Sequence, residues 1–218
     1  MTGFTAIIFD LDGTLIHSAP DLHFAANAAL ETIGRGPLDL ATIISFIGNG
    51  VETLVKRALA ATGGGDEALE RTVLAVFLEV YAENITTLTR PYDGVIASLE
   101  TFRSESIKLG ICTNKPTAPA LDICARLDLT QYFDVIVGAE AGRPKKPAPD
   151  MLLACLSQLG CPREKAIYVG DSAVDYQTAR NCDVTFRLFS KGYLNEPLPL
   201  LSAAEQFDNW HKNGILPA

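Results

Sequence analysis

Near the start of the chain runs Ala6-Ile7-Ile8-Phe9-Asp10-Leu11-Asp12-Gly13-Thr14. The first four residues of this segment are all apolar, which predicts a short, buried β-strand. Asp10 and Asp12 follow it, and because residues i and i+2 of an extended chain point to the same side, their carboxylates should share one face. One carboxylate could then attack a substrate while the other handles protons. The alternative interpretation is a strand that ends in an acidic turn.

Short apolar runs and helical stretches alternate in the second half of the chain. The runs cover residues 109–112, 135–137, 166–169 and, more weakly, 184–188. Apolar side chains recur at helical spacing around residues 96–102, 121–127 and 152–159. This alternation is typical of βαβ units, so we expect an α/β fold in which helices cover both faces of a Rossmann-like parallel sheet. Residues 202–210 predict a short terminal helix, in which Trp210 is a packing residue.

The segment from residue 20 to residue 90 interrupts this alternation. It contains no convincing strand pattern, and its apolar residues recur at helical spacing. Glycine-containing turns at residues 34–37, 48–50 and 63–65 separate the helical stretches. We therefore predict two domains. One is an α/β core of residues 1–15 and 91–218, and the other is an inserted helical cap of residues 16–90.

Composition limits the classes of partner and location. The chain has 218 residues, and its formal net charge is 18 − 26 = −8. An acidic chain without a basic stripe is a poor nucleic-acid binder, and we find no apolar run that is long enough to span a membrane. The five cysteines form no CxxC pair, which favours small buried side chains in a reducing compartment over a disulfide framework or a zinc site. With no signal-peptide pattern at its start, the sequence predicts a cytoplasmic protein, and it does not indicate an oligomeric state.

Polar, chemically useful residues follow each of the stronger predicted strands. They are Asp10 and Asp12 after the first, Thr113, Asn114 and Lys115 after the second, Lys146 beyond the third, and Asp171 and Asp175 after the fourth. Each has an ordinary alternative, such as a helix cap, a solvated lysine or an acid that favours a helix dipole. Because ligands collect at the carboxyl ends of parallel strands, we expect these residues to form one site. Crowded carboxylates need a cation, and oxygen ligands favour Mg²⁺, which suits the transfer of a phosphoryl group.

With these motifs in this order, the chain resembles the phosphatases of the haloacid dehalogenase superfamily over nearly its whole length. Asp10-Leu11-Asp12-Gly13-Thr14 matches the first motif of that superfamily, and Thr113-Asn114 matches the second. Lys146-Pro147-Ala148-Pro149 matches the third, and Gly170-Asp171-Ser172-Ala173-Val174-Asp175 matches the fourth. The resemblance implies that the helical insertion is a C1 cap.

The resemblance also implies a role for each motif residue. Asp10 would be the nucleophile that forms an aspartyl-phosphate, and Asp12 would protonate the leaving group and then activate water. Thr113 and Lys146 would hold the phosphoryl oxygens. The ligands implied for Mg²⁺ are Asp10, the main-chain carbonyl of Asp12, Asp171 and Asp175. The further residues implied to bind substrate are Gly13, Thr14, Asn114 and Lys115.

Four segments resemble the phosphoglycolate phosphatase subgroup in particular, namely residues 47–52, 113–116, 145–150 and 191–193. Within the first of them, Gly48-Asn49-Gly50 would bring the start of a cap helix over the site, where its free amides could bind a small carboxylate. An ordinary interhelical turn is the alternative for this segment. His17 and Asn181-Cys182 depart from the pattern of the subgroup.

The substrate expected from this resemblance is 2-phosphoglycolate or a similar small phosphorylated metabolite. One alternative is a β-phosphoglucomutase-like phosphotransferase, which would keep its aspartyl-phosphate long enough to return the phosphoryl group. Another is a broad sugar-phosphate or nucleotide phosphatase. A third is a catalytically silent binding protein on the same fold, because fold does not determine function.

Overall fold

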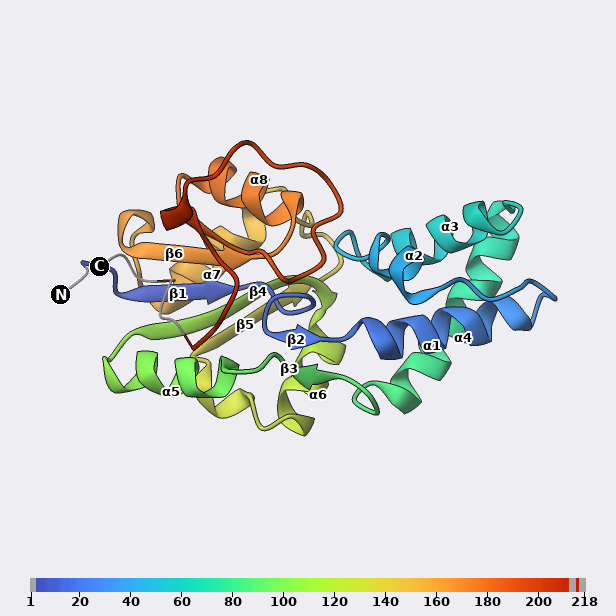
Figure 1. The fold of residues 1–218 in the computed structure, drawn as a ribbon, viewed down its shortest axis with the longest axis horizontal. Helices are drawn as coiled ribbons and strands as arrows, with labels where there is room; N and C mark the ends of the chain where they lie inside the picture. The colour runs from blue at the N-terminus through green and yellow to red at the C-terminus, as the bar shows by residue number, and fades with distance from the viewer. Residues whose placement is uncertain (1–2, 212–214, 216–218) are drawn as a thin grey trace.

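The computed structural model describes residues 3–211 and residue 215. The described residues contain a six-stranded sheet in the order β5-β4-β1-β6-β7-β8, and each neighbouring pair of strands is parallel (Figure 1). The strands are β1 (Ala6–Phe9), β4 (Lys108–Pro116), β5 (Val135–Ala139), β6 (Ala166–Gly170), β7 (Thr185–Phe189) and β8 (Gln206–Phe207). The α/β fold with a Rossmann-like parallel sheet, predicted from the sequence, is confirmed.

Helices cover both faces of this sheet (Figure 1). They are α5 (Val95–Ser104), α6 (Thr117–Arg126), α7 (Asp150–Leu159) and α8 (Ala173–Cys182). Successive residues of a strand point to opposite faces. Ile7 and Phe9 therefore pack in the cluster that contains α5 and α6, whereas Ala6 and Ile8 pack in the cluster that contains α7 and α8. Because both faces of β1 are buried, its sequence is continuously apolar rather than alternating.

The insertion consists of helices and leaves the sheet directly after the first motif. The helices are α1 (Ala19–Glu31), α2 (Leu40–Ile44), α3 (Val51–Ala61) and α4 (Glu67–Asn84). Asp39 and Asp66 each cap a helix by accepting a hydrogen bond from a backbone N–H in its first turn. The two connections to the core pair with each other as short antiparallel strands, β2 (Ile16–His17) and β3 (Arg90–Pro91). The predicted domain boundaries at residues 16 and 90 stay a prediction.

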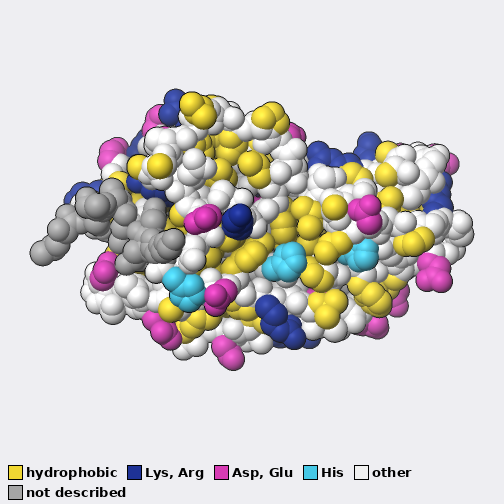
Figure 2. Space-filling model, in the orientation of Figure 1, with side chains coloured by type: hydrophobic (Ala, Val, Ile, Leu, Met, Phe, Trp, Pro, Cys, Tyr) yellow, Lys and Arg dark blue, Asp and Glu magenta, His cyan; other side chains and the backbone are white. Residues whose placement is uncertain are grey.

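Apolar packing continues from the sheet into the insertion. Leu22 of α1, Leu54 of α3 and Phe77 of α4 belong to the same buried cluster as Ile7 and Phe9 of β1. On the face shown in Figure 2, hydrophobic side chains also gather between the two parts of the molecule. Basic side chains are interspersed with acidic ones on that face (Figure 2). None of the helices among residues 3–211 combines the length and the hydropathy that a membrane span requires.

The terminal segment differs from its prediction. Residues 202–210 were expected to form a helix, but the structure shows a 3₁₀ turn, η3 (Ala203–Glu205), followed by the edge strand β8. β8 pairs with β7 through Leu188 and Phe189, so tertiary pairing along an open sheet edge overrides the local helical pattern. Trp210 is buried beside Phe207 and Phe189, as predicted for a packing residue.

Candidate active site

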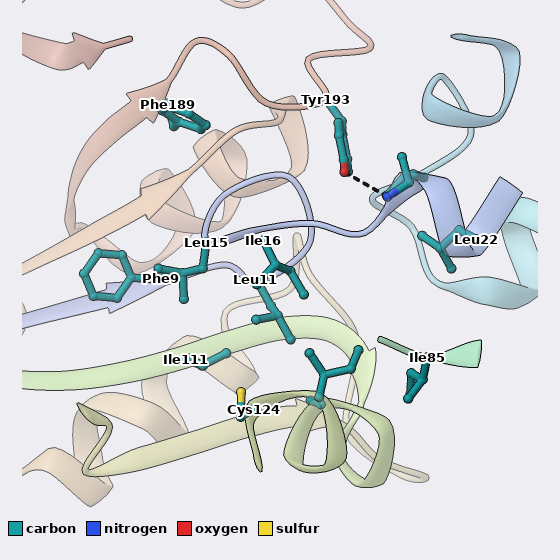
Figure 3. Packing of buried hydrophobic residues seen from close by; sticks show 14 of the residues in the cluster. Phe9, Leu11, Leu15, Ile16, Leu22, Ile85, Ile111, Cys124, Phe189 and Tyr193 are labelled. Carbon is teal, nitrogen blue, oxygen red and sulfur yellow. Dashed lines mark hydrogen bonds between the residues drawn. The ribbon is translucent and has the colours of Figure 1, made fainter. Parts of the chain in front are cut away.

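The predicted site residues meet at the carboxyl ends of three adjacent strands. β1 lies between β4 and β6, so Asp10 after β1 stands between Thr113 in β4 and Asp171 after β6. Leu11, which stands between Asp10 and Asp12 in the sequence, packs in the buried hydrophobic cluster (Figure 3). Asp10 and Asp12 line the same cavity. The convergence expected from the strand ends is therefore present in the structure.

Lys146 connects two carboxylates of the site. Its Nζ lies 2.9 Å from Asp10 Oδ1, and it donates to Asp175 Oδ1 at 2.7 Å and to Tyr168 Oη at 2.8 Å. Asn114 fixes the backbone of Lys146, since its Oδ1 accepts from Lys146 N (2.8 Å) and its Nδ2 donates to Lys146 O (3.1 Å). The second and third motifs are thereby held together in one rigid unit.

Burial and the charges of neighbouring groups shift the pKa values of these carboxyl groups. Burial raises the pKa of Asp10 to about 6, although Lys146 acts in the opposite direction. Burial, together with the charges of Asp175 and Asp10, raises the pKa of Asp171 well above its usual value. Burial alone would also raise the pKa of Asp175, but the charge of Lys146 and the hydrogen bonds from Lys146, Ser172 and Tyr168 together lower it. The site therefore holds more negative charge than Lys146 offsets.

Asp171 is held by the first motif and by the loop after β7. Thr14 Oγ1 donates to Asp171 Oδ1 at 2.8 Å, and Tyr193 N donates to Asp171 Oδ2 at 2.6 Å. Gly13 has φ +87°, and a Cβ at this position would collide with Asp171 and the Tyr193 ring. The substrate contacts implied for Gly13 and Thr14 stay a prediction, and in this structure both residues support Asp171.

Asp12 forms an ion pair with Lys115 rather than with a motif residue. Lys115 Nζ lies 3.2 and 3.1 Å from the two Asp12 oxygens and donates to Tyr81 Oη of α4 at 2.8 Å. The side chain of Lys115 is almost fully buried, and although burial would lower its pKa, Asp12 and Tyr81 raise it above its usual value. Thr113, whose Oγ1 accepts from Lys115 N at 3.2 Å, lines the same cavity.

Residues of the insertion form part of the wall of this cavity. A space of about 40 Å³ lies between the strand ends, the turn before α3 and the apolar side chains Leu22, Ile47 and Leu54. That volume holds no more than a few water molecules. Gly48 and Gly50 line it, together with Val51 at the start of α3, and the binding of substrate by this turn stays a prediction. Asn49 is not among the lining residues, and its carbonyl accepts from Thr53 Oγ1 at 3.2 Å.

Polar contacts hold this turn against the core. Asn114 Nδ2 donates to Gly48 O at 3.0 Å, and Asn195 Nδ2 donates to Ile47 O at 2.8 Å. Lys145 Nζ forms an ion pair with Glu52 Oε2 at 2.8 Å. These contacts show that the insertion is closed over the strand ends in this structure.

The three buried carboxylates fit a divalent cation. Asp10, Asp171 and Asp175 each offer an oxygen, and these oxygens lie within 4.8 Å of one another. Within the described chain, Asp10 Oδ1 is buried and accepts no hydrogen bond, because Lys146 Nζ approaches it at 2.9 Å as an ion pair without hydrogen-bond geometry. A set of oxygen ligands with excess negative charge is what a hard cation prefers.

Three tyrosines belong to the site and were not assigned to it from the sequence. Tyr168 Oη donates to Asp175 Oδ1 at 2.9 Å, Tyr81 contacts Lys115, and Tyr193 supports Asp171. A polar hydroxyl in the otherwise apolar run Ala166-Ile167-Tyr168-Val169 was a signal for the first of them. Tyr81 lay at an ordinary apolar helix position in the sequence, so it gave no such signal.

A parallel sheet with clustered aspartates and a lysine at its carboxyl end, closed by an inserted helical cap, defines a hydrolase of the haloacid dehalogenase type. The family model for haloacid dehalogenase-like hydrolases matches residues 7–189. The chain belongs to this family.

Individual relatives share most of their length with the chain. It is 42% identical over 193 residues to a phosphoglycolate phosphatase of Cereibacter sphaeroides, which covers 88% of each protein. It is 38% identical over 206 residues to the phosphoglycolate phosphatase of Rhodobacter capsulatus, with 94% and 93% covered. A crystal structure described as a predicted phosphoglycolate phosphatase from Haemophilus somnus superimposes with a TM-score of 0.89 at 27% identity, over 97% of this chain and 96% of that one.

Proposed function

We propose that the chain is a Mg²⁺-dependent phosphomonoester hydrolase that acts on 2-phosphoglycolate or a similar small phosphorylated carboxylate. The observation that carries this proposal is the position of Asp10, which lines the cavity, lies 2.9 Å from Lys146 Nζ and offers an oxygen within 4.8 Å of those of Asp171 and Asp175. The relatives named phosphoglycolate phosphatase support the choice of substrate.

In the first step Asp10 attacks the phosphorus atom, and the bond from phosphorus to the ester oxygen breaks. The phosphoryl group is then carried by Asp10 as an aspartyl-phosphate. Lys146 and Thr113 bind phosphoryl oxygens during this transfer. Asp10, Asp171, Asp175 and the main-chain carbonyl of Asp12 would hold Mg²⁺, which would supply positive charge to offset the negative charge of the phosphoryl group.

Asp12 handles the protons of both steps. It gives a proton to the departing ester oxygen, which leaves as an alcohol, and it then takes a proton from the water that attacks the aspartyl-phosphate. Inorganic phosphate is released and Asp10 is regenerated. Asp12 and Asp10 line the same cavity, which supports this division of labour.

The cap turn supports a substrate that carries a carboxylate. α3 begins at Val51, beside Gly48 and Gly50 on the cavity, and the backbone amides at the start of a helix attract anions. The small, partly apolar cavity favours a short substrate. Such a metabolite also agrees with the cytoplasmic location expected from the sequence, which stays a prediction.

The test is a comparison of kcat/KM over a panel of phosphorylated metabolites, measured by release of inorganic phosphate with Mg²⁺ present. 2-Phosphoglycolate is expected to give the highest value. A higher value for hexose phosphates or nucleotides would favour the broad phosphatase, and a phosphorylated sugar product with little free phosphate would favour the phosphotransferase. The absence of turnover on every ester, including p-nitrophenyl phosphate, would contradict the proposal.

Replacement of Asp12 by Ala should affect poor leaving groups most. An alkoxide leaves badly without a proton, so turnover of alkyl phosphates should fall by about 10²–10⁴-fold. Aryl phosphates such as p-nitrophenyl phosphate need less acid assistance and should lose less than about tenfold. Steady-state kinetics on both substrate types measure the difference. Equal losses on the two types would assign Asp12 to structure or to the metal instead.

Replacement of Gly50 by Ala should weaken recognition of the carboxylate. Gly50 has φ +90°, which strains any residue with a Cβ, and a Cβ there would lie 3.1 Å from Lys145 Nζ and 3.2 Å from Glu52 Oε2, so the ion pair of these side chains must shift. We expect KM for 2-phosphoglycolate to rise by about tenfold or more, whereas KM for p-nitrophenyl phosphate should change by less than about threefold.

Gly36→Ala is the matched control for this variant. Gly36 lies in another turn of the insertion, does not have a positive φ, and a Cβ there meets no atom within 4 Å. Its kinetics should equal those of the unsubstituted enzyme. Parallel losses on both substrates in Gly50→Ala would indicate damaged folding of the cap, and unchanged KM values would place the specificity elsewhere.

A further inference from the structure

Lys191-Gly192-Tyr193 is a motif that the proposed reaction does not use. It lies in the loop between β7 and β8 and packs against the first motif. Gly192 lies so close to Asp171 and to the carbonyl of Gly13 that a Cβ would collide with both. The loop therefore packs closely against the candidate metal ligand Asp171, and Tyr193 is the next residue of the loop.

The backbone of Tyr193 contacts the candidate metal ligand Asp171. Its N–H donates to Asp171 Oδ2 at 2.6 Å. Asp171 Oδ1 is occupied by Thr14 Oγ1, so each oxygen of this carboxylate has one donor from the protein. Any movement of Asp171 toward a cation is transmitted directly to the backbone of residue 193.

The side chain of Tyr193 contacts the start of the cap. Its Oη accepts a hydrogen bond of 3.0 Å from the N–H of Ala19, the first residue of α1 (Figure 3). The first N–H groups of a helix have no partner within the helix. Within residues 3–211, the N-cap residue Ser18 makes no side-chain cap bond, and its buried Oγ has no partner. Tyr193 supplies this cap from 174 residues away in the sequence.

The same hydroxyl also contacts the connection between core and cap. Tyr193 Oη lies 2.8 Å from Nδ1 of His17, which is part of β2. Burial lowers the pKa of His17, so its neutral ring can accept the hydroxyl proton while the oxygen accepts from Ala19. Both polar functions of the Tyr193 hydroxyl are used, and the side chain is 4% exposed. His17 is one of the positions at which the sequence departs from the phosphoglycolate phosphatase subgroup.

From these contacts we infer that Tyr193 is a positioning residue that couples occupation of the metal site to the position of the cap. Tyr193 contacts both the candidate metal site and the cap, because its N–H contacts Asp171 and its hydroxyl contacts β2 and the beginning of α1. The inference rests on the proposed function in one respect, namely that Asp171 binds the divalent cation. Coupling of this kind is reciprocal, so cap closure in turn favours the arrangement of Asp171 that is seen here.

The test is hydrogen exchange at the Ala19 amide, followed by NMR with and without Mg²⁺. In the unsubstituted protein Mg²⁺ should slow exchange of this amide by about fivefold or more. In Tyr193→Phe the amide should exchange faster than in the unsubstituted protein, and Mg²⁺ should no longer change its rate. Mg²⁺ affinity, measured by calorimetry, should weaken by no more than about the same fivefold factor, because the coupling is reciprocal and the N–H of residue 193 still supports Asp171.

Tyr132→Phe is the matched control. Its hydroxyl donates to Glu100 Oε1 at 3.3 Å on the exposed surface, so the variant loses one tyrosine hydrogen bond away from the connection between core and cap. The response of the Ala19 amide to Mg²⁺ should be unchanged in this variant. A purely structural role for Tyr193 would speed exchange with and without Mg²⁺ and leave the response to the ion intact.

The outcomes separate this inference from the proposed function. If calorimetry shows Mg²⁺ binding but the Ala19 amide of the unsubstituted protein does not respond, the coupling is wrong and the metal assignment stands. The same holds if Tyr193→Phe responds as the unsubstituted protein does. If the unsubstituted protein binds no Mg²⁺, the metal assignment itself fails, and the coupling fails with it.

Discussion

Replacement of Asp10 by Asn is expected to lower kcat by about four to six orders of magnitude, since loss of a catalytic nucleophile removes the reaction path itself. Asn has nearly the same shape but carries no attacking charge. The fold should persist, because Lys146 keeps its contacts to Asp175 and Tyr168 and the repulsion among the buried carboxylates is reduced. Phosphate release from p-nitrophenyl phosphate and 2-phosphoglycolate measures the loss.

Asp122→Asn is the control for this variant. Asp122 lies on α6 and pairs with Arg126 on the exposed surface, so the same chemical change is made away from the site. Its kcat should equal that of the unsubstituted enzyme. If a folded Asp10→Asn protein, verified by circular dichroism and thermal unfolding, retains a tenth of the original kcat, Asp10 is not the nucleophile.

Removal of divalent cations is expected to abolish turnover, and added Mg²⁺ is expected to restore it. Burial and the neighbouring carboxylates raise the pKa of Asp171 well above its usual value, which shows that this site favours a positive charge beyond that of Lys146. Asp171→Ala should increase the Mg²⁺ concentration for half-maximal activity by at least about ten- to a hundredfold, because even residues that only support metal ligands have effects of that size.

The measurement is initial rate against Mg²⁺ concentration after dialysis into EDTA. Asp183→Ala is a useful control, since this exposed acid follows α8 and contacts Arg163 at 3.5 Å rather than the site. Full activity in excess EDTA would contradict the metal assignment. An unchanged Mg²⁺ dependence in Asp171→Ala would remove Asp171 from the ligand set.

The sequence predicted the elements that depend on local patterns. The apolar run before Asp10 predicted a buried strand, and the polar residues after each strand predicted a site, because parallel topology alone brings strand ends together. The terminal segment was predicted wrongly because its structure depends on the free edge of β7 rather than on its own residues. Tyr193 contacts a residue 174 positions away in the sequence, and Lys115 contacts one 103 positions away. The spacing of apolar residues within a segment carries no information about such distant contacts.

The prediction for Lys115 illustrates the same limit within the site itself. Because Lys115 follows the second motif in the sequence, we expected it at the site, and in the structure it lines the cavity. Which group its ammonium contacts depends on the positions of Asp12 in the core and Tyr81 in α4, two elements that meet only when the chain is folded. The sequence therefore predicted that Lys115 lies at the site, but it could not predict that its ammonium contacts Asp12 and Tyr81.

The central place of β1 has a consequence for synthesis on the ribosome. Its residues leave the ribosome before those of the other strands, and their neighbours in the sheet are residues 108–111 and 166–169. Contacts so distant in the sequence form late, whereas helices α1–α4 are complete by residue 84. The nascent chain thus carries this apolar strand without a neighbour until residues 108–111 are added, and with its second edge open until residues 166–169 follow. Unpaired strand edges of this kind promote aggregation. A chain that stops before residue 166 has Asp10 but neither β6 nor Asp171 and Asp175, so it cannot assemble the site at all.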